Sequence, residues 1–185
     1  VLSLQGAFLK HMHLLKKIGV NPVNVRYKDD LLNLHGLIIP GGESTVLSKL
    51  IIKQSLYDPL EKFISKYPVY GTCAGLILLS RSIENNKIVK SFEKLDISIK
   101  RNGWGRQINS FISNLKIKEF DKSFKGIFIR APKINKVSSE VDVLSSINNS
   151  PVMVRQDNLL ATTFHPELSN DIRIHKYFIG MIESC

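Results

Sequence analysis

The chain has 185 residues, enough for one domain with a covered core, and we expect residues 1–185 to form that single domain. A hydrophobic content of 43% and a charged content of 23% are ordinary for a globular protein, and no apolar run approaches the ~20 residues of a membrane span. The net charge is +10, but the lysines are scattered and do not interleave with aromatic residues. We therefore expect neither a nucleic-acid partner nor a membrane partner.

Cysteine usage narrows the compartment and the chemistry. Cys73 is internal and Cys185 is the last residue, where we expect mobility, so the two do not make a disulfide framework. A lone internal thiol suits a reducing compartment, and we expect a cytoplasmic protein. The chain lacks the Cys/His spacing of zinc sites, and we expect no metal and no cofactor.

In the first part of the chain, apolar segments alternate with helical patterns, which predicts an α/β fold with a mostly parallel sheet. Apolar residues at Phe8, Met12, Leu15 and Ile18 form one helical stripe. The expected strands are 1–4, 23–27, 36–40 and 68–72, and the expected helices are 7–18, 44–53, 58–67 and 75–82.

The second part carries shorter strand patterns. Asp157-Asn158 is a two-residue hairpin signal between two apolar runs. We expect strands at 96–100, 113–117, 126–129, 141–144, 152–156 and 159–164, a closing helix at 172–182, and mobile loops at 84–94 and 133–140. Together these elements predict a single-domain, three-layer α/β/α, flavodoxin-like architecture, with antiparallel strands in the C-terminal half.

Cys73 lies in a Gly-x-Cys-x-Gly run between apolar segments, the pattern of a nucleophile elbow. A strand would arrive, turn sharply and become a helix, because a Cβ at either glycine would crowd the turn. The N-terminus of that helix favours a thiolate, the reactive form of cysteine. A buried structural cysteine at a strand end is the competing interpretation.

A cysteine nucleophile needs a base, and His165 in His-Pro-Glu is the best candidate. Pro166 biases His165 away from helical geometry, so it should end a strand, and Glu167 is close enough to turn back onto the imidazole. The other histidines are expected to be surface or structural residues. His11 and His13 should point in different directions because they lie two apart on one helix.

Residues 40–45, Pro-Gly-Gly-Glu-Ser-Thr, join a buried strand to a helix. Their glycines let the backbone approach a ligand, and N–H groups at the helix start suit an oxyanion. Ser44 or Thr45 is expected to cap the helix. Arg101 and Arg130 are candidate cations for a substrate carboxylate.

These segments together resemble the triad-type (class I) glutamine amidotransferases. The resemblance narrows to the glutaminase subunits of pyridoxal 5′-phosphate synthase and runs nearly end to end. It rests on ordered motifs at 4–7 (Leu-Gln-Gly-Ala), 40–45, 71–76, 101–107 (Arg-Asn, then Gly-Arg-Gln), 128–132 (Phe-Ile-Arg-Ala-Pro) and 164–168.

The resemblance implies that L-glutamine is hydrolysed to L-glutamate and ammonia. It also implies that the ammonia passes to a (β/α)₈-barrel synthase subunit, whose docking activates a nearly idle glutaminase. It assigns roles to these residues: Cys73 as nucleophile, His165 as proton carrier and Glu167 as its orienter; Gly42, Glu43, Ser44, Arg101, Ile129 and Arg130 for substrate binding; Gly41, Gly42, Ala74 and Gln5 at the oxyanion hole and partner interface.

Two alternatives stay open at this point. The elbow and the His-Pro-Glu segment also fit a stand-alone Cys-His-Glu γ-glutamyl hydrolase, although the motifs at 4–7 and 128–132 argue against it. The basic charge and the implied idle state of the free subunit fit a non-catalytic interaction module.

Overall fold

The computed structural model describes residues 1–104 and 110–184. Its first half alternates helices and strands in this order: α1 (Phe8–Lys17), η1 (Lys28–Leu31), β1 (Leu37–Ile39), α2 (Ser44–Lys53), α3 (Tyr57–Ile64), β2 (Val69–Thr72), α4 (Ala74–Leu79). The second half is mostly strands: β3 (Ser80–Ile83), β4 (Leu95–Lys100), β5 (Ser110–Leu115), β6 (Phe124–Ile129), β7 (Lys133–Val137), β8 (Asp142–Ile147), β9 (Ser150–Gln156), β10 (Leu159–Thr162), then η2 (Pro166–Leu168) and α5 (Arg173–Glu183).

The central sheet has the strand order β1-β2-β10-β9-β8. β2 pairs in parallel with β1 on one side and with β10 on the other. β10, β9 and β8 run antiparallel, and β9 and β10 are joined by the predicted hairpin at Asp157-Asn158. The predicted α/β class, with antiparallel strands added in the C-terminal half, is confirmed.

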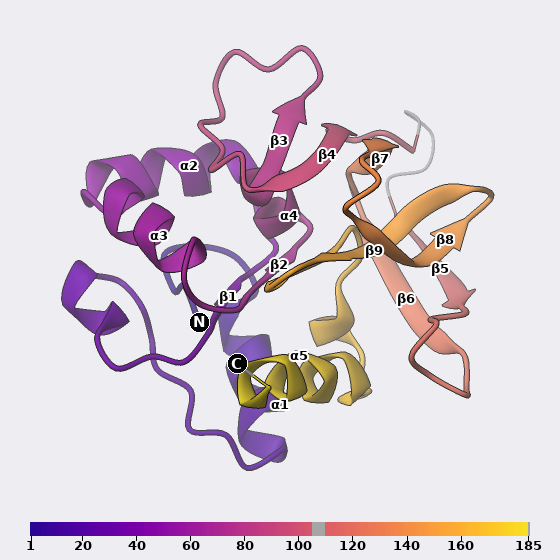
Figure 1. The fold of residues 1–185 in the computed structure, drawn as a ribbon, viewed down its shortest axis with the longest axis horizontal. Helices are drawn as coiled ribbons and strands as arrows, with labels where there is room; N and C mark the ends of the chain where they lie inside the picture. The colour runs from indigo at the N-terminus through magenta and orange to yellow at the C-terminus, as the bar shows by residue number, and fades with distance from the viewer. Residues whose placement is uncertain (105–109, 185) are drawn as a thin grey trace.

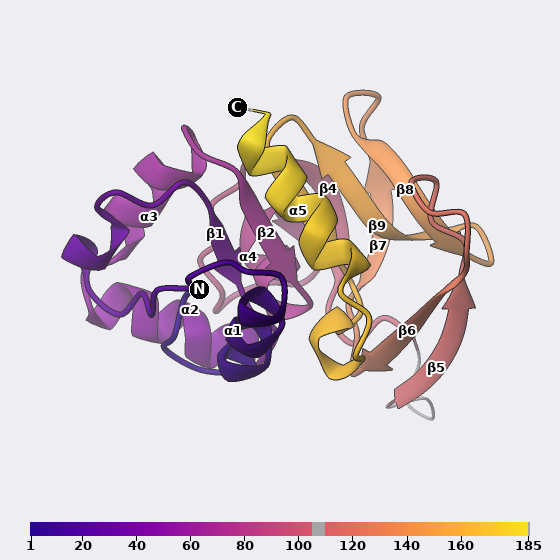
Figure 2. The ribbon, with the colours of Figure 1, turned by 90° about the horizontal axis from the view of Figure 1, so that it is seen from below.

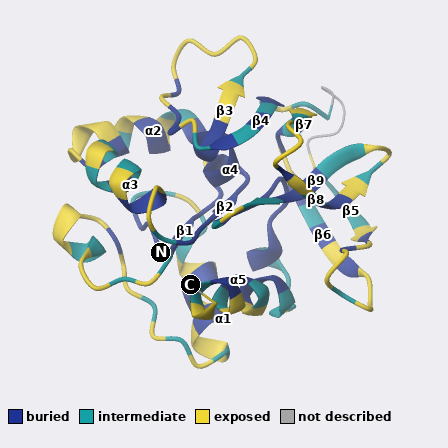
Figure 3. Cartoon of the chain, viewed as in Figure 1, coloured by how far each residue is buried: buried dark blue, intermediate teal, exposed yellow. Residues whose placement is uncertain are grey.

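Helices cover both faces of this sheet. Figures 1 and 2 show α2 and α3 on one side and α1 and α5 together on the other. Alternate residues of the buried strands pack into the cores on the two faces of the sheet, because successive side chains of a strand point to opposite faces. In β1, Leu37 and Ile39 join the core beneath α2, α3 and α4, while Ile38 packs toward α1 and α5. Figure 3 shows the strands buried between these helical layers.

The predicted strands at 1–4 and 23–27 shrink to a single parallel bridge between Leu2 and Val25. Hydrogen bonds still extend the sheet here, since the N–H of Leu2 donates to the carbonyl of Ile38 at 2.9 Å. The N–H of Ser3 likewise donates to the carbonyl of Val25 at 2.9 Å. The two segments hold strand positions at the sheet edge but are too short to count as strands.

Two predictions in the middle of the chain are wrong. The helix expected at 75–82 ends at Leu79, and β3 follows at once to pair in parallel with β4. The loop expected at 133–140 contains β7, which pairs antiparallel with β4 and buries Ile134. In both places the pairing with β4 decides the conformation.

Residues 84–94 form no helix or strand, as predicted, but they are not a free loop. Val89 and Phe92 are buried in the core, and Tyr57 of α3 stacks on Phe92 with ring centroids 4.9 Å apart. The remaining predicted helices and strands are found, with ends displaced by a few residues. Among the described helices, none is long and apolar enough to cross a membrane.

Candidate active site

Cys73 occupies the sharp turn between β2 and α4. Its backbone has φ 47° and ψ −96°, a left-handed conformation that costs a non-glycine residue ~1–3 kcal/mol. The N–H of Cys73 donates to the carbonyl of Thr162 at 2.8 Å, so the turn is tied to the end of the neighbouring strand β10. The side chain is 6% exposed. This is the geometry expected of a nucleophile elbow.

The two glycines of the elbow are required by close packing. A Cβ on Gly71 would lie 2.6 Å from the carbonyl carbon of Gly75, and a Cβ on Gly75 would lie 2.1 Å from the carbonyl oxygen of Ile39. Both clashes are with backbone, which cannot give way as a flexible side chain can. The elbow therefore presses α4 directly against β1 and β2.

His165 and Glu167 follow the end of β10, the strand next to the elbow strand. The Nδ1 atom of His165 and Oε1 of Glu167 are 2.7 Å apart, and both residues are buried. The N–H of His165 donates to the carbonyl of Ile127 in β6 at 2.8 Å, which fixes the backbone before η2 begins. Because Glu167 holds Nδ1, the other ring nitrogen, Nε2, is left for Cys73.

Charge favours an imidazolium at His165. Burial alone would lower its pKa, but hydrogen bonds to Cys73 and Glu167, together with their charges, raise the pKa of His165 to about 10. For Glu167, burial pushes the pKa up, but nearby His11 and the hydrogen bond to His165 hold it below its usual value. Glu167 therefore stays ionised at neutral pH and stabilises positive charge on His165.

The loop before α2 packs against both chemical centres. A Cβ on Gly41 would lie 2.3 Å from Cε1 of His165 and 3.4 Å from the Cβ of Cys73. The helix cap differs from the prediction, because Glu43 and not Ser44 or Thr45 caps α2. Its carboxylate accepts from the N–H groups of Thr45 at 3.2 Å and Val46 at 2.7 Å. Two carboxylate oxygens satisfy two helix-start donors at once, which one hydroxyl does not.

The side chain of Gln5 lies across this loop. Its Oε1 atom accepts from the N–H of Glu43 at 3.1 Å, so that N–H is not free for another acceptor. The N–H of Ala74, in contrast, is the first of α4 and has no acceptor within the helix. The candidate donors for an oxyanion thus differ in availability. The N–H of Glu43 is already bonded to Gln5, whereas the N–H of Ala74 at the start of α4 is available.

A cavity of about 350 Å³ opens beside Cys73 and His165. It gathers residues from distant parts of the chain: Gln5, Gly42, Glu43, Ser44, Cys73, Ile77, Arg101, Asn102, Ile129, Arg130 and His165. Of the predicted site residues, Gly41, Ala74 and Glu167 are not part of this lining. A larger, mainly apolar cavity of about 420 Å³ beside α5 contains none of the predicted residues.

Two lining residues, Ile77 and Asn102, were not predicted for the site. Ile77 lies one helical turn beyond Cys73 on α4, so helical periodicity could have indicated it. Asn102 adjoins Arg101 and has φ 51°, a conformation that Asn adopts more readily than most residues. The adjacent motif residues Gly105, Arg106 and Gln107, like Cys185, lie outside the described residues.

The arginines of the cavity are held differently. Arg101 Nη2 donates to Glu43 Oε1 at 3.0 Å, which ties its guanidinium to the cap of α2. Arg130 follows β6 with φ 44°, and this left-handed turn ends the strand at the cavity. Among the described residues, no three His, Cys, Asp or Glu side chains are placed to hold a metal ion.

The histidines of α1 divide as predicted, with His13 exposed and His11 buried. His11 is fully buried, and its Nε2 atom lies 3.5 Å from Oε2 of Glu167. His175 of α5, also fully buried, lies 2.9 Å from His11 through its Nε2 atom. His11 thus contacts the carboxylate behind His165, a position that local sequence patterns do not reveal.

A cysteine elbow, an imidazole and a carboxylate at neighbouring strand ends of an α/β sheet form the arrangement of a triad-type cysteine hydrolase. The family model described as the SNO glutamine amidotransferase family matches residues 1–184. The chain therefore belongs to the SNO glutamine amidotransferase family.

Curated relatives match along nearly their whole length. The chain is 48% identical to "Pyridoxal 5'-phosphate synthase subunit PdxT" of Fervidobacterium nodosum, over 99% of the chain and 96% of the relative. It is 50% identical to the protein of the same name from Pseudothermotoga lettingae, over 98% of the chain and 93% of the relative. A solved structure titled "Crystal structure of glutamine amidotransferase" has a TM-score of 0.93 at 39% identity, covering 98% of this chain and 97% of its own.

Proposed function

We propose that this chain is the glutaminase subunit of a pyridoxal 5′-phosphate synthase. It hydrolyses L-glutamine to L-glutamate and ammonia, and it passes the ammonia to a (β/α)₈-barrel synthase subunit that builds the vitamin B6 cofactor. We assign the activity to the cytoplasm. The observation that carries the proposal is the cavity onto which Cys73 and His165 open, in a chain of the amidotransferase family.

Cys73 is the proposed nucleophile. Its thiolate attacks the side-chain amide carbon of glutamine, forming a C–S bond and an oxyanion. His165 then gives the proton on Nε2 to the amide nitrogen, the C–N bond breaks, and ammonia leaves a thioester on Cys73. Glu167 keeps the imidazolium oriented through Nδ1, as the acid of a triad does.

Water completes the reaction. The neutral imidazole of His165 removes a proton from a water molecule, whose oxygen attacks the thioester carbon. The second tetrahedral intermediate collapses, the C–S bond breaks, and glutamate leaves Cys73 as a thiolate beside the imidazolium. Glutamine and water are consumed, glutamate and ammonia are formed, and the enzyme returns to its starting charge state.

The remaining predicted residues hold the substrate and its transient charge. Arg101 and Arg130 bind the α-carboxylate, and Glu43 faces the α-amino group, since opposite charges pair. Gly42, Ser44 and Ile129 shape the cavity. The N–H of Ala74 and an N–H of the Gly41-Gly42 loop receive the oxyanion. Since Gln5 occupies the N–H of Glu43, we propose that docking of the synthase subunit rearranges this loop.

The test is glutamate release from glutamine by the chain alone and by the chain mixed with its synthase partner. Partner-dependent release that disappears in Cys73→Ala is expected. Partner-independent turnover of γ-glutamyl peptides would point instead to a stand-alone hydrolase. Binding of the partner without labelling of Cys73 by a glutamine-mimicking electrophile would point to a non-catalytic module.

A further inference from the structure

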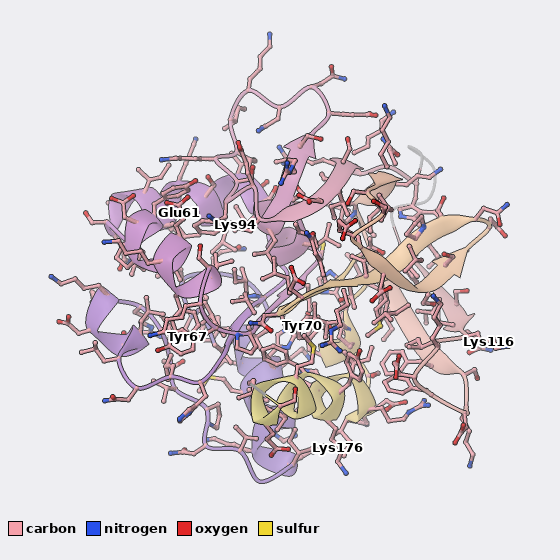
Figure 4. The ribbon with its side chains drawn as sticks, viewed as in Figure 1. Glu61, Tyr67, Tyr70, Lys94, Lys116 and Lys176 are labelled. Atoms are coloured by element: carbon pink, nitrogen blue, oxygen red, sulfur yellow. The ribbon has the colours of Figure 1, made fainter. Side chains whose placement is uncertain are left out.

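A pair of histidines lies on the side of Glu167 away from the cavity. His11 comes from α1 and His175 from α5, the two helices that cover the same face of the sheet (Figure 2). Both are 0% exposed, and the edges of their rings meet the ring of Tyr70 with centroids 6.3 Å away in each case. Tyr70, labelled in Figure 4, lies in the middle of the molecule near α5. Three aromatic rings thus seal the space behind the carboxylate.

The carboxylate of Glu167 has one satisfied and one unsatisfied oxygen. Oε1 accepts from Nδ1 of His165, whereas Oε2 is buried without a hydrogen-bond donor at standard distance among the described residues. The nearest candidate is Nε2 of His11 at 3.5 Å. A buried carboxylate oxygen without a donor is costly, so a proton on Nε2 of His11 would stabilise the ion.

Hydrogen-bond accounting decides where that proton is. Nδ1 of His11 and Nε2 of His175 are 2.9 Å apart, so one of them donates and the other accepts. If His11 donated, its Nε2 would be a bare lone pair facing the carboxylate. If His175 donates, Nε2 of His11 carries a proton toward Glu167 Oε2 and Thr72 Oγ1, which lies at 3.3 Å.

The far end of the pair gives the same answer independently. Nδ1 of His175 is buried without a hydrogen-bond partner among the described residues. Either form leaves this atom unsatisfied, but a buried N–H without an acceptor is the rarer and less favourable of the two, so a bare nitrogen is favoured here. His175 therefore carries its one proton on Nε2 and donates it to His11. The two unsatisfied atoms, Oε2 of Glu167 and Nδ1 of His175, therefore favour the same tautomer for each histidine ring, with the proton on Nε2.

We propose that His11 and His175 are positioning residues for the triad, forming a directed relay in which His175 donates to His11 and His11 donates to Oε2 of Glu167. The relay fixes the rotation of the carboxylate, so that Oε1 stays aimed at His165. It rests on the proposed function, because the group it serves is the orienter of the base. His11 and His175 do not touch the substrate cavity.

Electrostatics supports neutral rings in the relay. Burial lowers the pKa of His11 to about 4, with Glu167 opposing that change, and burial lowers the pKa of His175 to about 3. A neutral imidazole has one N–H, so each ring donates in one direction only, from His175 to His11 to Glu167. An imidazolium has two N–H groups and would not fix that direction. The charged and titratable groups facing Glu167 are His165 from its own segment, His11 from α1, Tyr70 from β2 and His175 from α5.

The first experiment reads the tautomers directly and does not depend on catalysis. Long-range ¹H–¹⁵N spectra of ¹⁵N-histidine-labelled protein at pH 7 distinguish a proton on Nε2 from one on Nδ1. His11→Gln and His175→Gln each remove one ring and so assign the signals. Both rings are expected to be neutral and protonated on Nε2. A proton on Nδ1 of His11, or a charged His11 at pH 7, overturns the proposal.

The second experiment uses the complex with the synthase subunit. His11→Phe leaves Oε2 of Glu167 without its donor, and kcat for glutamate release is expected to fall ~10–100-fold with KM little changed. His11→Gln places an amide N–H near the lost one and is expected to recover most of kcat. His13→Phe, the same change on the exposed side of α1, is the matched control and should leave both constants unchanged.

The pH profile separates positioning from mere packing. Without its donor the carboxylate of Glu167 protonates more easily, so the acid limb of kcat is expected to move up by about one pH unit in His11→Phe. An unmoved limb, or no recovery in His11→Gln, contradicts the relay. If the unchanged complex releases no glutamate, the proposed function fails, while the tautomer measurement still stands or falls separately.

Discussion

The two sides of the Cys73–His165–Glu167 group differ in exposure and in the kinds of residue that form them. The front side is a cavity of about 350 Å³ lined by charged side chains and glycine-rich backbone, with Arg101 and Glu43 partly exposed. The back side is closed, with His11 and His175 fully buried between helices and beneath Tyr70. The front must admit and release a substrate, whereas the back has only to hold one carboxylate still.

This difference assigns different kinetic consequences to the two sides. A front residue lines the cavity proposed for the substrate, so its loss should appear in KM. A back residue acts on the substrate only through Glu167 and His165, so its loss should appear in kcat. Gly41 lies where the two sides meet. A side chain at this position would clash with His165, so glycine is required there.

The largest expected effect is at the meeting point itself. Cys73→Ala removes the proposed nucleophile, and glutaminase activity of the complex should fall by at least ~10⁴-fold. Steady-state glutamate release measures the loss, and circular dichroism checks the fold, which should survive because Ala fits the space of Cys. Activity that persists in Cys73→Ala would mean that another residue is the nucleophile.

Glu167→Gln should follow, with kcat lower by ~10³–10⁴-fold. The amide can present an N–H to Nδ1 of His165, which selects the wrong tautomer and removes the negative charge that stabilises the imidazolium. KM for glutamine should change much less. A loss confined to KM would place Glu167 on the substrate side and erase the distinction between front and back.

On the front side, Arg101→Gln should raise KM for glutamine by ~10–100-fold while kcat stays within about threefold, since hydrogen bonds to a charged group contribute ~1.5–3 kcal/mol. Lys100→Gln, an exposed neighbour outside the cavity lining, is the matched control and should change neither constant. A fall in kcat without a rise in KM would show that Arg101 orders the catalytic loop through Glu43.

The last effect concerns stability against pH rather than activity, and it belongs to the back side. His11 has a folded pKa of about 4 against an ordinary value of 6.5. Between these values the unfolded chain binds a proton that the folded chain does not, so stability is complete above pH 6.5 and falls as the pH drops toward 4. The loss from His11 is on the order of 3 kcal/mol. His175, whose pKa is lowered to about 3, loses stability in the same acid window, so urea unfolding at several pH values measures the sum of the two.

His165 does not contribute to that acid window, because its pKa is raised to about 10 and both states are protonated below pH 6.5. Its contribution is lost as the pH rises through 10. His13→Ala is the control, and it should leave the acid dependence unchanged because His13 is exposed. A flat acid dependence in the unchanged protein would mean that His11 and His175 are both charged in the folded state.

The front side was largely predictable from sequence, because its residues lie in local motifs. Gly-x-Cys-x-Gly, His-Pro-Glu and the glycine loop each predict a turn at the end of a strand. Parallel strands bring those turns to one sheet edge, as β1, β2 and β10 do here. The segments around Arg101 and Arg130 indicated candidate cations, and the resemblance to the amidotransferases assigned both residues to substrate binding.

The back side and the small strands were not predictable in this way. His11 and His175 are 164 residues apart, and only the packing of α1 beside α5 brings them together. β7 has the sequence Lys-Ile-Asn-Lys-Val, too polar to indicate a strand, and its conformation comes from pairing with β4. β3 likewise depends on pairing with β4, whereas the local pattern alone predicts that the helix continues past Leu79.

The position of β10 in the sheet has a consequence for how the protein is made. This strand inserts between β2 and β9, yet it belongs to the last quarter of the chain. During synthesis the elbow around Cys73 leaves the ribosome first and waits with an open sheet edge until β10 arrives. His165, Glu167 and the backbone bond from Cys73 to Thr162 are all added in one late event. Incomplete chains that end before β10 therefore carry the Cys73 thiol without His165 and Glu167.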